Sequence, residues 1–359
     1  MAGKRLGHGP AGDFQIPSAD LDVFVEELRG RSGVPGVSVA FLKQGDLVWH
    51  RQFGYADRAG RVPLTGDVLM QGASLTKPTF ACAFLRLCEE RLCDLDKPVA
   101  EVMPDFPIAA DPRAAAITPR QLLSHTSGLP LTHSPEWPLY LEASPGGVFS
   151  YSGAGYICLQ RLAEFRARKP LTRIMRKYVV EPLGWKRSCY TTSGASGRVS
   201  QGYDWDGSVV QPPGHYDKAN AAASLHTTAL EYVEFIKRVL LPDHYGVAGI
   251  LRPETAKTMA APHVNVAGGI AWGLGWGIHS TEGSDRLFHW ADSRGFMHYA
   301  TIDQRNATAL VVLTNGRHGL RLCEEVTART MGEGERSVFD WIYRGFYEAG
   351  GTPIPPWPR

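Results

Sequence analysis

Hydrophobic residues in the N-terminal part of the chain follow first a helical and then a strand-like spacing. Between residues 21 and 28, apolar side chains recur at intervals of three and four, which places them on one face of a helix that Ser18 can cap. Two apolar runs follow, Val37 to Lys43 and Leu47 to Ala56, joined at Gln44-Gly45-Asp46. This pattern predicts one helix followed by a β-hairpin.

Helical spacing then dominates the middle of the chain, and strand-like runs return towards its end. The predicted helices of the middle region span Phe80 to Leu92, Tyr156 to Arg168, Leu171 to Val180 and Ala229 to Leu240. The predicted late strands span Trp276 to His279, Leu287 to Trp290, Met297 to Asp303 and Thr308 to Leu313. Two closing helices are predicted near Leu320 to Arg329 and Val338 to Tyr347.

The two groups of strands therefore flank a helical middle region. We expect an α+β fold in which one antiparallel sheet, built from both ends of the chain, is flanked by helices. Residues 1–78 and 246–359 would form this discontinuous sheet domain, and residues 79–245 a mainly helical insertion. Residues 1–12 and 351–359 are expected to be flexible. The active site is expected at the seam between the two regions.

The composition is that of an ordinary globular protein and argues against several classes of function. The 359 residues are 43% hydrophobic and 21% charged, with a formal net charge of +2. With no basic stripe, binding to nucleic acid or to a membrane surface is not expected. No apolar run approaches the roughly 18 residues of a membrane-spanning helix. The N-terminus lacks the apolar segment of a secretory signal.

Cysteine and histidine usage points to a cytoplasmic protein without a cofactor. The six cysteines show no CxxC pair and no framework spacing, which favours reduced thiols. The 12 histidines show no ligand-like spacing, so no metal site is expected. The chain has no GxSxG, HExxH or GxxxxGK[ST] motif. The GxGxG of Gly273 to Gly277 falls inside a strand-like stretch, which does not suit a dinucleotide loop.

The segment from Gln71 to Pro78 carries the clearest candidate for a nucleophile. Ser74 and Lys77 lie three positions apart, so on a helix they share a face and the amine can reach the hydroxyl. Pro78 fits only the first turn of a helix, so Ser74 must lie near the helix N-terminus. Backbone N–H groups there can stabilise an oxyanion, and a neutral amine can activate the serine hydroxyl.

Chance is the alternative explanation for this spacing. On the order of one Ser-x-x-Lys is expected by chance in a chain of this length. Here the pair follows a predicted hairpin, opens a predicted helix and comes after the small residues Gly72 and Ala73, which suit a tight turn. Its position therefore favours a catalytic serine more strongly than the spacing alone.

Further segments occur in the order that is typical of one enzyme superfamily. They are Ile117 to Pro130 (ITPRQLLSHTSGLP), Pro145 to Gly153 (PGGVFSYSG), Phe288 to Ala291 (FHWA) followed by Gly295-Phe296, and Val311 to Asn315 (VVLTN). Together with Ser74-Leu75-Thr76-Lys77, they resemble the serine β-lactamase and penicillin-binding-protein superfamily, in the branch of class C β-lactamases and family VIII carboxylesterases. The resemblance extends from about Val34 to Thr330.

The resemblance implies a role for each matching residue. Ser74 would be the acylated nucleophile, and Lys77 and Tyr151 would share proton transfer. The oxyanion hole would be formed by the backbone N–H groups of Ser74 and of a residue near Asp292. The third motif of the superfamily falls on His289, Trp290 and Ala291, and further candidate substrate contacts are Ser152, Gly153, Trp276 and Asn315.

Each of these side chains also has a purely structural interpretation. Tyr151 lies in an aromatic stretch and could belong to the core, and His125 could simply hold its loop. Tryptophans such as Trp272, Trp276 and Trp290 line a cleft or only pack. The spacing of the residues does not decide between these interpretations.

Two motifs depart from the β-lactamase pattern. The second motif, Tyr-x-Asn in β-lactamases, is Tyr151-Ser152-Gly153 here, and the third, Lys-Thr-Gly, is His289-Trp290-Ala291. Both changes remove polar groups that would hold a β-lactam, and the imidazole of His289 is mostly neutral near pH 7. Efficient antibiotic hydrolysis is therefore not expected. A Tyr151 phenolate would be less stabilised, so activity should rise towards mildly alkaline pH.

The function that we predict is a serine hydrolase acting on an ester, a thioester or an amide of a small molecule. The first alternative is a transacylase that passes the acyl group to an amine or an alcohol, for example in the biosynthesis of an antibiotic. Less favoured alternatives are a β-lactamase or D-Ala-D-Ala carboxypeptidase and a non-catalytic binder. The sequence leaves the acyl donor, the acceptor and the oligomeric state open.

Overall fold

The computed structural model describes residues 18–103, 111–132, 139–195, 197–210, 216–241, 249–281 and 284–348. The two ends that the sequence predicts to be flexible, residues 1–12 and 351–359, lie outside this part of the chain. The proposed cap of the first helix, the side chain of Ser18, also lies outside it.

Both ends of the described chain contribute strands to one antiparallel sheet. The strands are β1 (Gly36–Lys43), β2 (Asp46–Asp57), β3 (Val62–Pro63), β6 (Val264–Ala267), β7 (Ile270–Trp272), β8 (Gly277–Thr281), β9 (Ser284–Ser293), β10 (Phe296–Asp303) and β11 (Thr308–Thr314). Their order is β3-β2-β1-β11-β10-β9-β8-β7-β6, so an N-terminal strand pairs with the last strand. In this register, Val39 on β1 lies opposite Val312 on β11. This topology confirms the predicted fold class.

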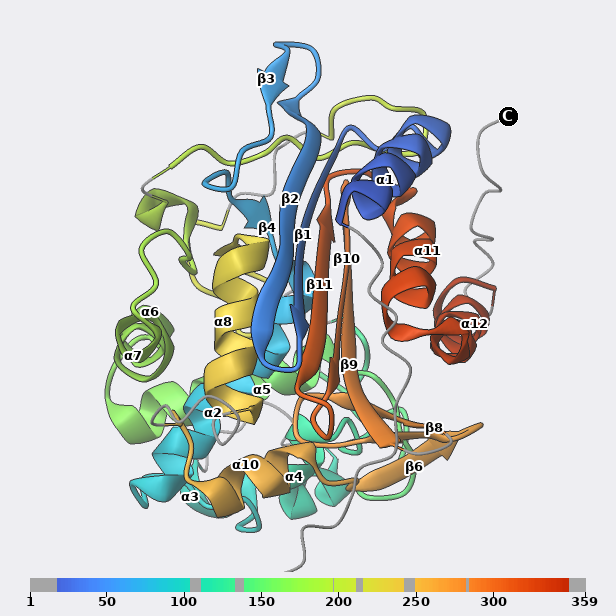
Figure 1. Cartoon of the computed structure of the whole chain (residues 1–359). Helices are drawn as coiled ribbons and strands as arrows, with labels where there is room; N and C mark the ends of the chain where they lie inside the picture. The colour runs from blue at the N-terminus through green and yellow to red at the C-terminus, as the bar shows by residue number, and fades with distance from the viewer. Residues whose placement is uncertain are drawn as a thin grey trace, which may run out of the picture.

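Helices cover both faces of this sheet (Figure 1). The longer helices are α1 (Ser18–Ser32), α2 (Thr76–Glu89), α5 (Gly153–Ala167), α8 (Ala229–Leu240), α10 (Pro253–Ala260), α11 (Gly319–Met331) and α12 (Arg336–Ile342). On one face α1 contacts β2, and α11 contacts β10 and β11, while α8 contacts β1 and β11 on the other. β1 is consequently buried on both faces from Gly36 to Leu42.

Short elements complete the described chain. They are β4 (Met70–Gln71), β5 (His226–Thr227), η1 (Ala73–Leu75), α3 (Val99–Val102), η2 (Pro112–Ala116), α4 (Pro119–Leu123), α6 (Leu171–Met175), η3 (Arg176–Val180), α7 (Glu181–Leu183), η4 (Thr192–Gly194), η5 (Glu333–Glu335) and η6 (Tyr343–Glu348). β4 and β5 pair with each other in a separate two-stranded sheet. Among the described helices, none is both long enough and apolar enough to cross a membrane.

The sequence predicted the long periodic elements best. Helix α8 has the predicted bounds, because Thr228 caps it by accepting a hydrogen bond from the Glu231 N–H at 3.2 Å. Helix α2 begins at Thr76 instead of Phe80, directly after the η1 turn. The division into residues 1–78 with 246–359 and residues 79–245 remains a prediction.

The structure corrects the prediction for the glycine-rich segment before β8. Only Gly277 of this segment lies in a strand; residues 273–276 form the turn between β7 and β8, closed by a hydrogen bond from the Gly273 N–H to the Trp276 carbonyl at 2.8 Å. Strands β6 and β7 were not predicted, because these short strands are defined by their pairing rather than by local spacing.

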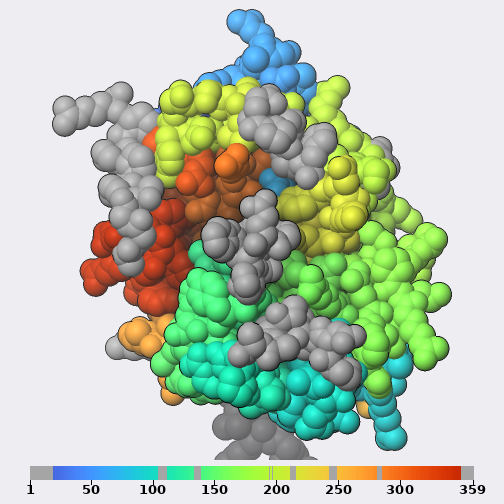
Figure 2. All heavy atoms as spheres, turned by 180° about the vertical axis from the view of Figure 1, so that it is seen from behind, coloured from blue at the N-terminus to red at the C-terminus, as the bar shows by residue number. Residues whose placement is uncertain are grey.

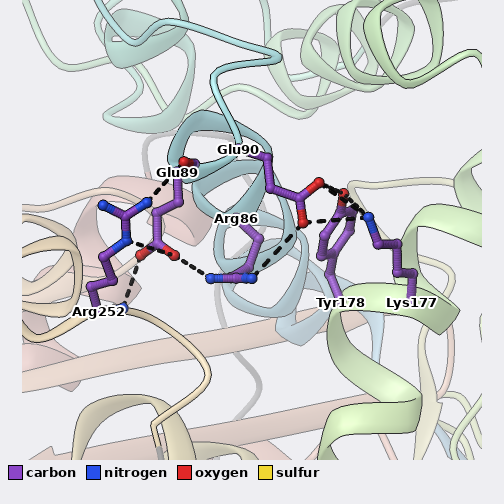
Figure 3. Close-up of polar contacts among 6 residues, drawn as sticks. All are labelled: Arg86, Glu89, Glu90, Lys177, Tyr178 and Arg252. Carbon is purple, nitrogen blue, oxygen red and sulfur yellow. Dashed lines mark hydrogen bonds and ion pairs between the residues drawn. The ribbon is translucent and has the colours of Figure 1, made fainter.

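A network of charged residues anchors the C-terminal end of α2 (Figure 3). Arg86 bonds the carboxylate of Glu89, and the Arg252 N–H donates to Glu89 Oε1 at 2.8 Å. The neighbouring Glu90 accepts hydrogen bonds from Lys177 at 3.1 Å and from the Tyr178 hydroxyl at 2.7 Å. The two glutamates differ in burial, because the side chain of Glu89 is 5% exposed and that of Glu90 34% exposed.

This difference in burial predicts different contributions to stability. We expect Glu89→Gln to lower the free energy of unfolding by about 2 to 3 kcal/mol, because it removes the charge of a side chain that is only 5% exposed and is paired with Arg86. Glu90→Gln, the matched control one residue away, should cost less than about 1 kcal/mol, since its ion pairs are exposed to water. Urea unfolding measures both values. If both variants lost the same free energy of unfolding, the difference in burial between Glu89 and Glu90 would not explain their contributions to stability.

Candidate active site

The local backbone places Ser74 at the start of a helix. Ser74 is partly exposed and lies in the middle of the η1 turn, which runs directly into α2. Ala73 has a φ of 45°, in the left-handed region that residues other than glycine rarely adopt. Its carbonyl accepts a hydrogen bond from the Thr76 hydroxyl at 2.6 Å, which holds the turn. This strained turn presents the Ser74 hydroxyl at the tip of the helix.

The amine of Lys77 contacts the Ser74 hydroxyl directly. Lys77 Nζ lies 3.0 Å from Ser74 Oγ and donates a hydrogen bond to the carbonyl of Ala222 at 2.9 Å. The side chain is buried, and burial lowers the pKa of Lys77 from its ordinary value to about 7. A large fraction of the molecules therefore carries a neutral amine at neutral pH, with a lone pair that can accept the Ser74 proton.

The other ionisable groups near this amine carry no charge at neutral pH. The rings of Tyr151 and Tyr156 lie 5.0 Å and 5.7 Å from Lys77 Nζ. Burial raises the pKa of both phenols, so both stay protonated. Burial and the nearby Lys77 lower the pKa of His125 well below its ordinary value and that of His289 to about 3. None of these four described neighbours therefore gives Lys77 an anionic partner that would favour its charged form.

Tyr151 lies just before α5 in a tightly packed aromatic environment. Its ring lies 4.3 Å from that of His125, between ring centroids, and 5.1 Å from that of Trp290. Its hydroxyl is buried and has no well-aligned hydrogen-bond partner among the described residues. Burial raises the pKa of this phenol, and the nearby Ser74 hydroxyl offsets part of the rise. A protonated phenol beside Ser74 is suited to donate a proton rather than to remove one.

The strand that carries the third motif has one free edge beside the serine. β8 pairs with β9 only as far as Phe288, so no described strand pairs with residues 289–293 on that edge. The η1 turn packs against β9. His289 Nδ1 donates a hydrogen bond to the Trp290 carbonyl at 2.7 Å, which fixes its tautomer and leaves Nε2 as a buried lone pair without a partner.

The side chains of the third motif lie on opposite faces of the sheet. Ala291 is buried on the side of Ser74, whereas Trp290 packs against Trp341 of α12 at 5.6 Å between ring centroids. The Asp292 carboxylate is paired with Arg317 on that second face. The side chain of Asp292 is therefore engaged on that second face.

The remaining predicted contacts hold the framework of the site. The Ser152 hydroxyl caps α5 by accepting the Gly155 N–H at 2.8 Å and donates to the Pro130 carbonyl at 2.7 Å. The Asn315 side chain accepts the Gly36 N–H at 2.6 Å and bonds two more partners, which ties β1 to the end of β11.

The last two predicted contacts are also packed into the framework of the site. Trp276 is fully buried, and its ring stacks on that of Phe235 at 6.4 Å between centroids. Gly153 donates its N–H to the Leu131 carbonyl at 2.9 Å. A contact of any of these four residues with substrate remains a prediction.

Several residues that the predicted site omitted are part of this arrangement. The Ala222 carbonyl holds Lys77, and no sequence pattern marks an alanine for such a role. His125 Nδ1 accepts the Ser152 N–H at 3.0 Å, so it holds the loop that carries Tyr151. His298 donates to the Gln71 carbonyl at 2.8 Å and thereby fixes β4, just before the η1 turn. A histidine inside an otherwise apolar strand was the available signal for His298.

The segments that supply these residues meet on one face of the molecule. Seen from behind, the orange strands of the C-terminal part, the yellow segment before α8 and the green segment before α5 surround a hollow (Figure 2). A blue patch of the N-terminal part is visible inside it. The site is therefore assembled from regions that are distant in sequence.

Comparison with known families agrees with this geometry. The family model described as Beta-lactamase matches residues 21–329. The chain belongs to the beta-lactamase family. Within this family, it is 26% identical to penicillin-binding protein 4 of Amycolatopsis lactamdurans, an alignment that covers 86% of this chain and 88% of that protein. It is 24% identical to protein flp of Staphylococcus aureus, over 82% of this chain, and spans only 62% of that protein's length.

Solved structures of beta-lactamase-like proteins share the fold. The penicillin-binding protein homologue of Pyrococcus abyssi, described as octameric, superposes with a TM-score of 0.76 at 23% identity and covers 89% of this chain and 78% of its own. D-amino acid amidase of Ochrobactrum anthropi superposes with a TM-score of 0.70 at 23% identity, and the match covers 89% of this chain and 99% of the amidase. EstCE1, described as a hydrolase with promiscuous acyltransferase activity, superposes with a TM-score of 0.70 at 22% identity. The match covers 86% of this chain and 98% of EstCE1.

Proposed function

We propose that this protein is a serine hydrolase that forms an acyl-enzyme at Ser74 with an ester, a thioester or an amide of a small molecule. The observation that carries the proposal is the 3.0 Å contact between Ser74 Oγ and a buried Lys77 amine. Burial lowers the pKa of Lys77 to about 7, so that the amine can act as a base near neutral pH. Membership of the beta-lactamase family supports the same reaction class.

The proposed reaction has two proton transfers of opposite direction. Lys77 removes the Ser74 proton while Oγ forms a bond to the substrate carbonyl carbon, and the carbonyl electron pair moves to its oxygen. The N–H groups of Ser74 and Asp292 stabilise this oxyanion. When the bond to the leaving group breaks, the Lys77 proton passes through the Tyr151 hydroxyl to the departing atom. Water then attacks the acyl-enzyme, and the same groups act in reverse.

The position of the Asp292 N–H on the free edge of β9 is supported by strand geometry. Residues two apart in a strand direct their backbone groups to the same edge. The Trp290 carbonyl accepts a hydrogen bond from the His289 side chain. This bond favours a backbone orientation in which the carbonyl of Trp290 is directed to the free edge and not to β10. Asp292, two residues further on, then directs its N–H towards Ser74.

The surroundings of the site favour a neutral substrate. The neutral His289 stands where the superfamily has a lysine, and Trp290 adds an aromatic ring that packs on Tyr151. Without a cation there, a carboxylate-bearing antibiotic loses its main attraction to the site. We therefore propose small esters, thioesters or activated amides from the cytoplasm as substrates, with no cofactor or metal in the mechanism.

Acyl transfer to an amine or an alcohol is the second candidate function. It is favoured by the dry environment of the proton-transfer groups, since Lys77 and the Tyr151 hydroxyl are both buried away from water. A hydrolase and a transacylase would share the acyl-enzyme and differ only in the group that accepts the acyl chain. Product analysis with and without an added amine separates them.

Intact-mass measurement tests the acyl-enzyme directly. We expect a fluorophosphonate and at least one slowly hydrolysed ester to add their mass to the wild-type chain, with the label mapped to Ser74 by peptide analysis. A β-lactam such as a penicillin should add little or none in the same time. The absence of any adduct on Ser74 across an ester, thioester and β-lactam panel would favour the non-catalytic binder.

A further inference from the structure

The C-terminal segment that follows the family match lies against the candidate active site. The matched residues end at 329, whereas α12 and η6 span Arg336–Ile342 and Tyr343–Glu348. These elements pack on the side of the sheet that carries α11 (Figure 1). From behind, the red C-terminal part borders the green segment before α5 (Figure 2). The segment thus lies beyond the matched residues and reaches the site.

Tyr347 holds the strand that carries the proposed oxyanion donor. Its side chain is buried, and its hydroxyl donates a hydrogen bond to Asp292 Oδ2 at 2.7 Å. Arg317 bonds the other carboxylate oxygen of Asp292. Two hydrogen-bond partners therefore hold the Asp292 side chain on the face of the sheet that packs against α12. Because that side chain and the N–H share one Cα, fixing the carboxylate also orients the N–H at the free edge.

Phe346, the preceding residue, touches the other half of the catalytic machinery. Its ring lies 5.7 Å from that of Tyr151, edge to face, and 4.6 Å from that of Trp290, between centroids. Tyr151 is therefore held between His125 on one side and Trp290 with Phe346 on the other. Such packing restricts the ring and keeps water away from its hydroxyl.

We propose that Phe346 and Tyr347 are positioning residues of the active site, Phe346 acting through Tyr151 and Tyr347 through Asp292. This inference rests on the proposed function of Ser74, Tyr151 and Asp292. It assigns the C-terminal segment an indirect part in acyl transfer, because two adjacent residues position the proton donor and the oxyanion donor together.

The chain offers a matched control for Tyr347. Tyr343, one turn earlier in the same segment, also donates its hydroxyl to a carboxylate, that of Glu324 at 2.9 Å. Its ring packs on that of Tyr347 at 6.5 Å between centroids, and phenylalanine at position 343 would keep this ring. We expect Tyr347→Phe to lower kcat about tenfold with KM changed less than twofold, because a displaced N–H stabilises the oxyanion less. Tyr343→Phe should leave both constants within twofold. Equal kinetics for the two variants would overturn the role of Tyr347.

Phe346 has a different expected signature. Phe346→Leu should loosen Tyr151 and so slow proton donation, which matters most for poor leaving groups. We expect kcat/KM, which reports acylation, to fall about tenfold for an alkyl ester and less than threefold for the p-nitrophenyl ester of the same acid. Tyr347→Phe should lower both rates equally, since the oxyanion forms with either ester. An equal loss for both esters in Phe346→Leu would overturn its role.

An activity-independent measurement separates this inference from the proposed function. Amide hydrogen exchange of residues 289–297 should be faster in Tyr347→Phe than in Tyr343→Phe, because only the first variant releases Asp292. Wild-type protein that forms no Ser74 adduct would refute the proposed function, whatever the exchange shows. Unchanged exchange in this segment would refute the positioning by Tyr347, whether or not the wild type is active.

Discussion

Replacing Ser74 by alanine is expected to lower kcat/KM for a p-nitrophenyl ester by about 10⁴-fold or more. The substitution removes the oxygen that we propose forms the covalent bond to the acyl group, and it leaves Lys77 without the hydroxyl that it would activate. The hydroxyl is partly exposed and contacts the amine of Lys77, so its removal should leave the fold intact. Initial rates and thermal unfolding of the same preparations measure both effects.

Ser208→Ala serves as the control for this substitution. Ser208 is exposed and lies outside the elements that form the site, so its variant should keep wild-type kinetics. An unfolding midpoint of Ser74→Ala close to that of the wild type would show that the loss is chemical. Residual activity within tenfold of the wild type would sink the acyl-enzyme mechanism.

Replacing Lys77 by methionine should lower kcat/KM about 10³-fold and make the fold more stable at neutral pH. Methionine fills much of the same volume but offers no lone pair to accept the Ser74 proton. The sign of the stability change follows from the lowered pKa of Lys77, about 7 when folded and 10.5 as its ordinary value. Between these values the unfolded chain binds more protons, so wild-type stability should rise with pH across this window.

Urea unfolding at several pH values tests that prediction. Lys77→Met lacks the titrating group, so its advantage over the wild type should be largest at pH 7 and below and should shrink towards pH 10. A constant difference over this range would contradict the lowered pKa. The loss of the hydrogen bond to the Ala222 carbonyl acts in the opposite direction and does not depend on pH.

The wild-type pH profile follows from the same group. We expect kcat/KM to rise about tenfold per pH unit below pH 7 and to level off above it, as Lys77 becomes neutral. Because burial raises the pKa of Tyr151, no second rise is expected up to pH 9. The expected increase towards alkaline pH thus has its origin in Lys77 and not in a Tyr151 phenolate. A profile that is flat from pH 6 to 9 would contradict this assignment.

Some of the candidate site could be predicted because its residues are close in sequence. Ser74 and Lys77 share a helix face by spacing alone, and Pro78 marks the first turn of that helix. The resemblance of later segments to a known superfamily added Tyr151 and the strand of His289. The η1 turn, with Ala73 at a positive φ, could not be predicted, because neither composition nor periodicity signals that conformation.

The amino-acid sequence by itself determined most of the longer helices, the hairpin of β1 and β2 and the late strands, because their apolar spacing is a property of neighbouring residues. It did not predict α10. Only the tertiary structure decided the depth at which Lys77 is buried, the carbonyl of Ala222 that holds it and the contact of Tyr347 with Asp292. Burial and long-range hydrogen bonds depend on segments that come together only in the folded chain. The chemistry of the amine therefore arises from packing, although its position in the helix is local.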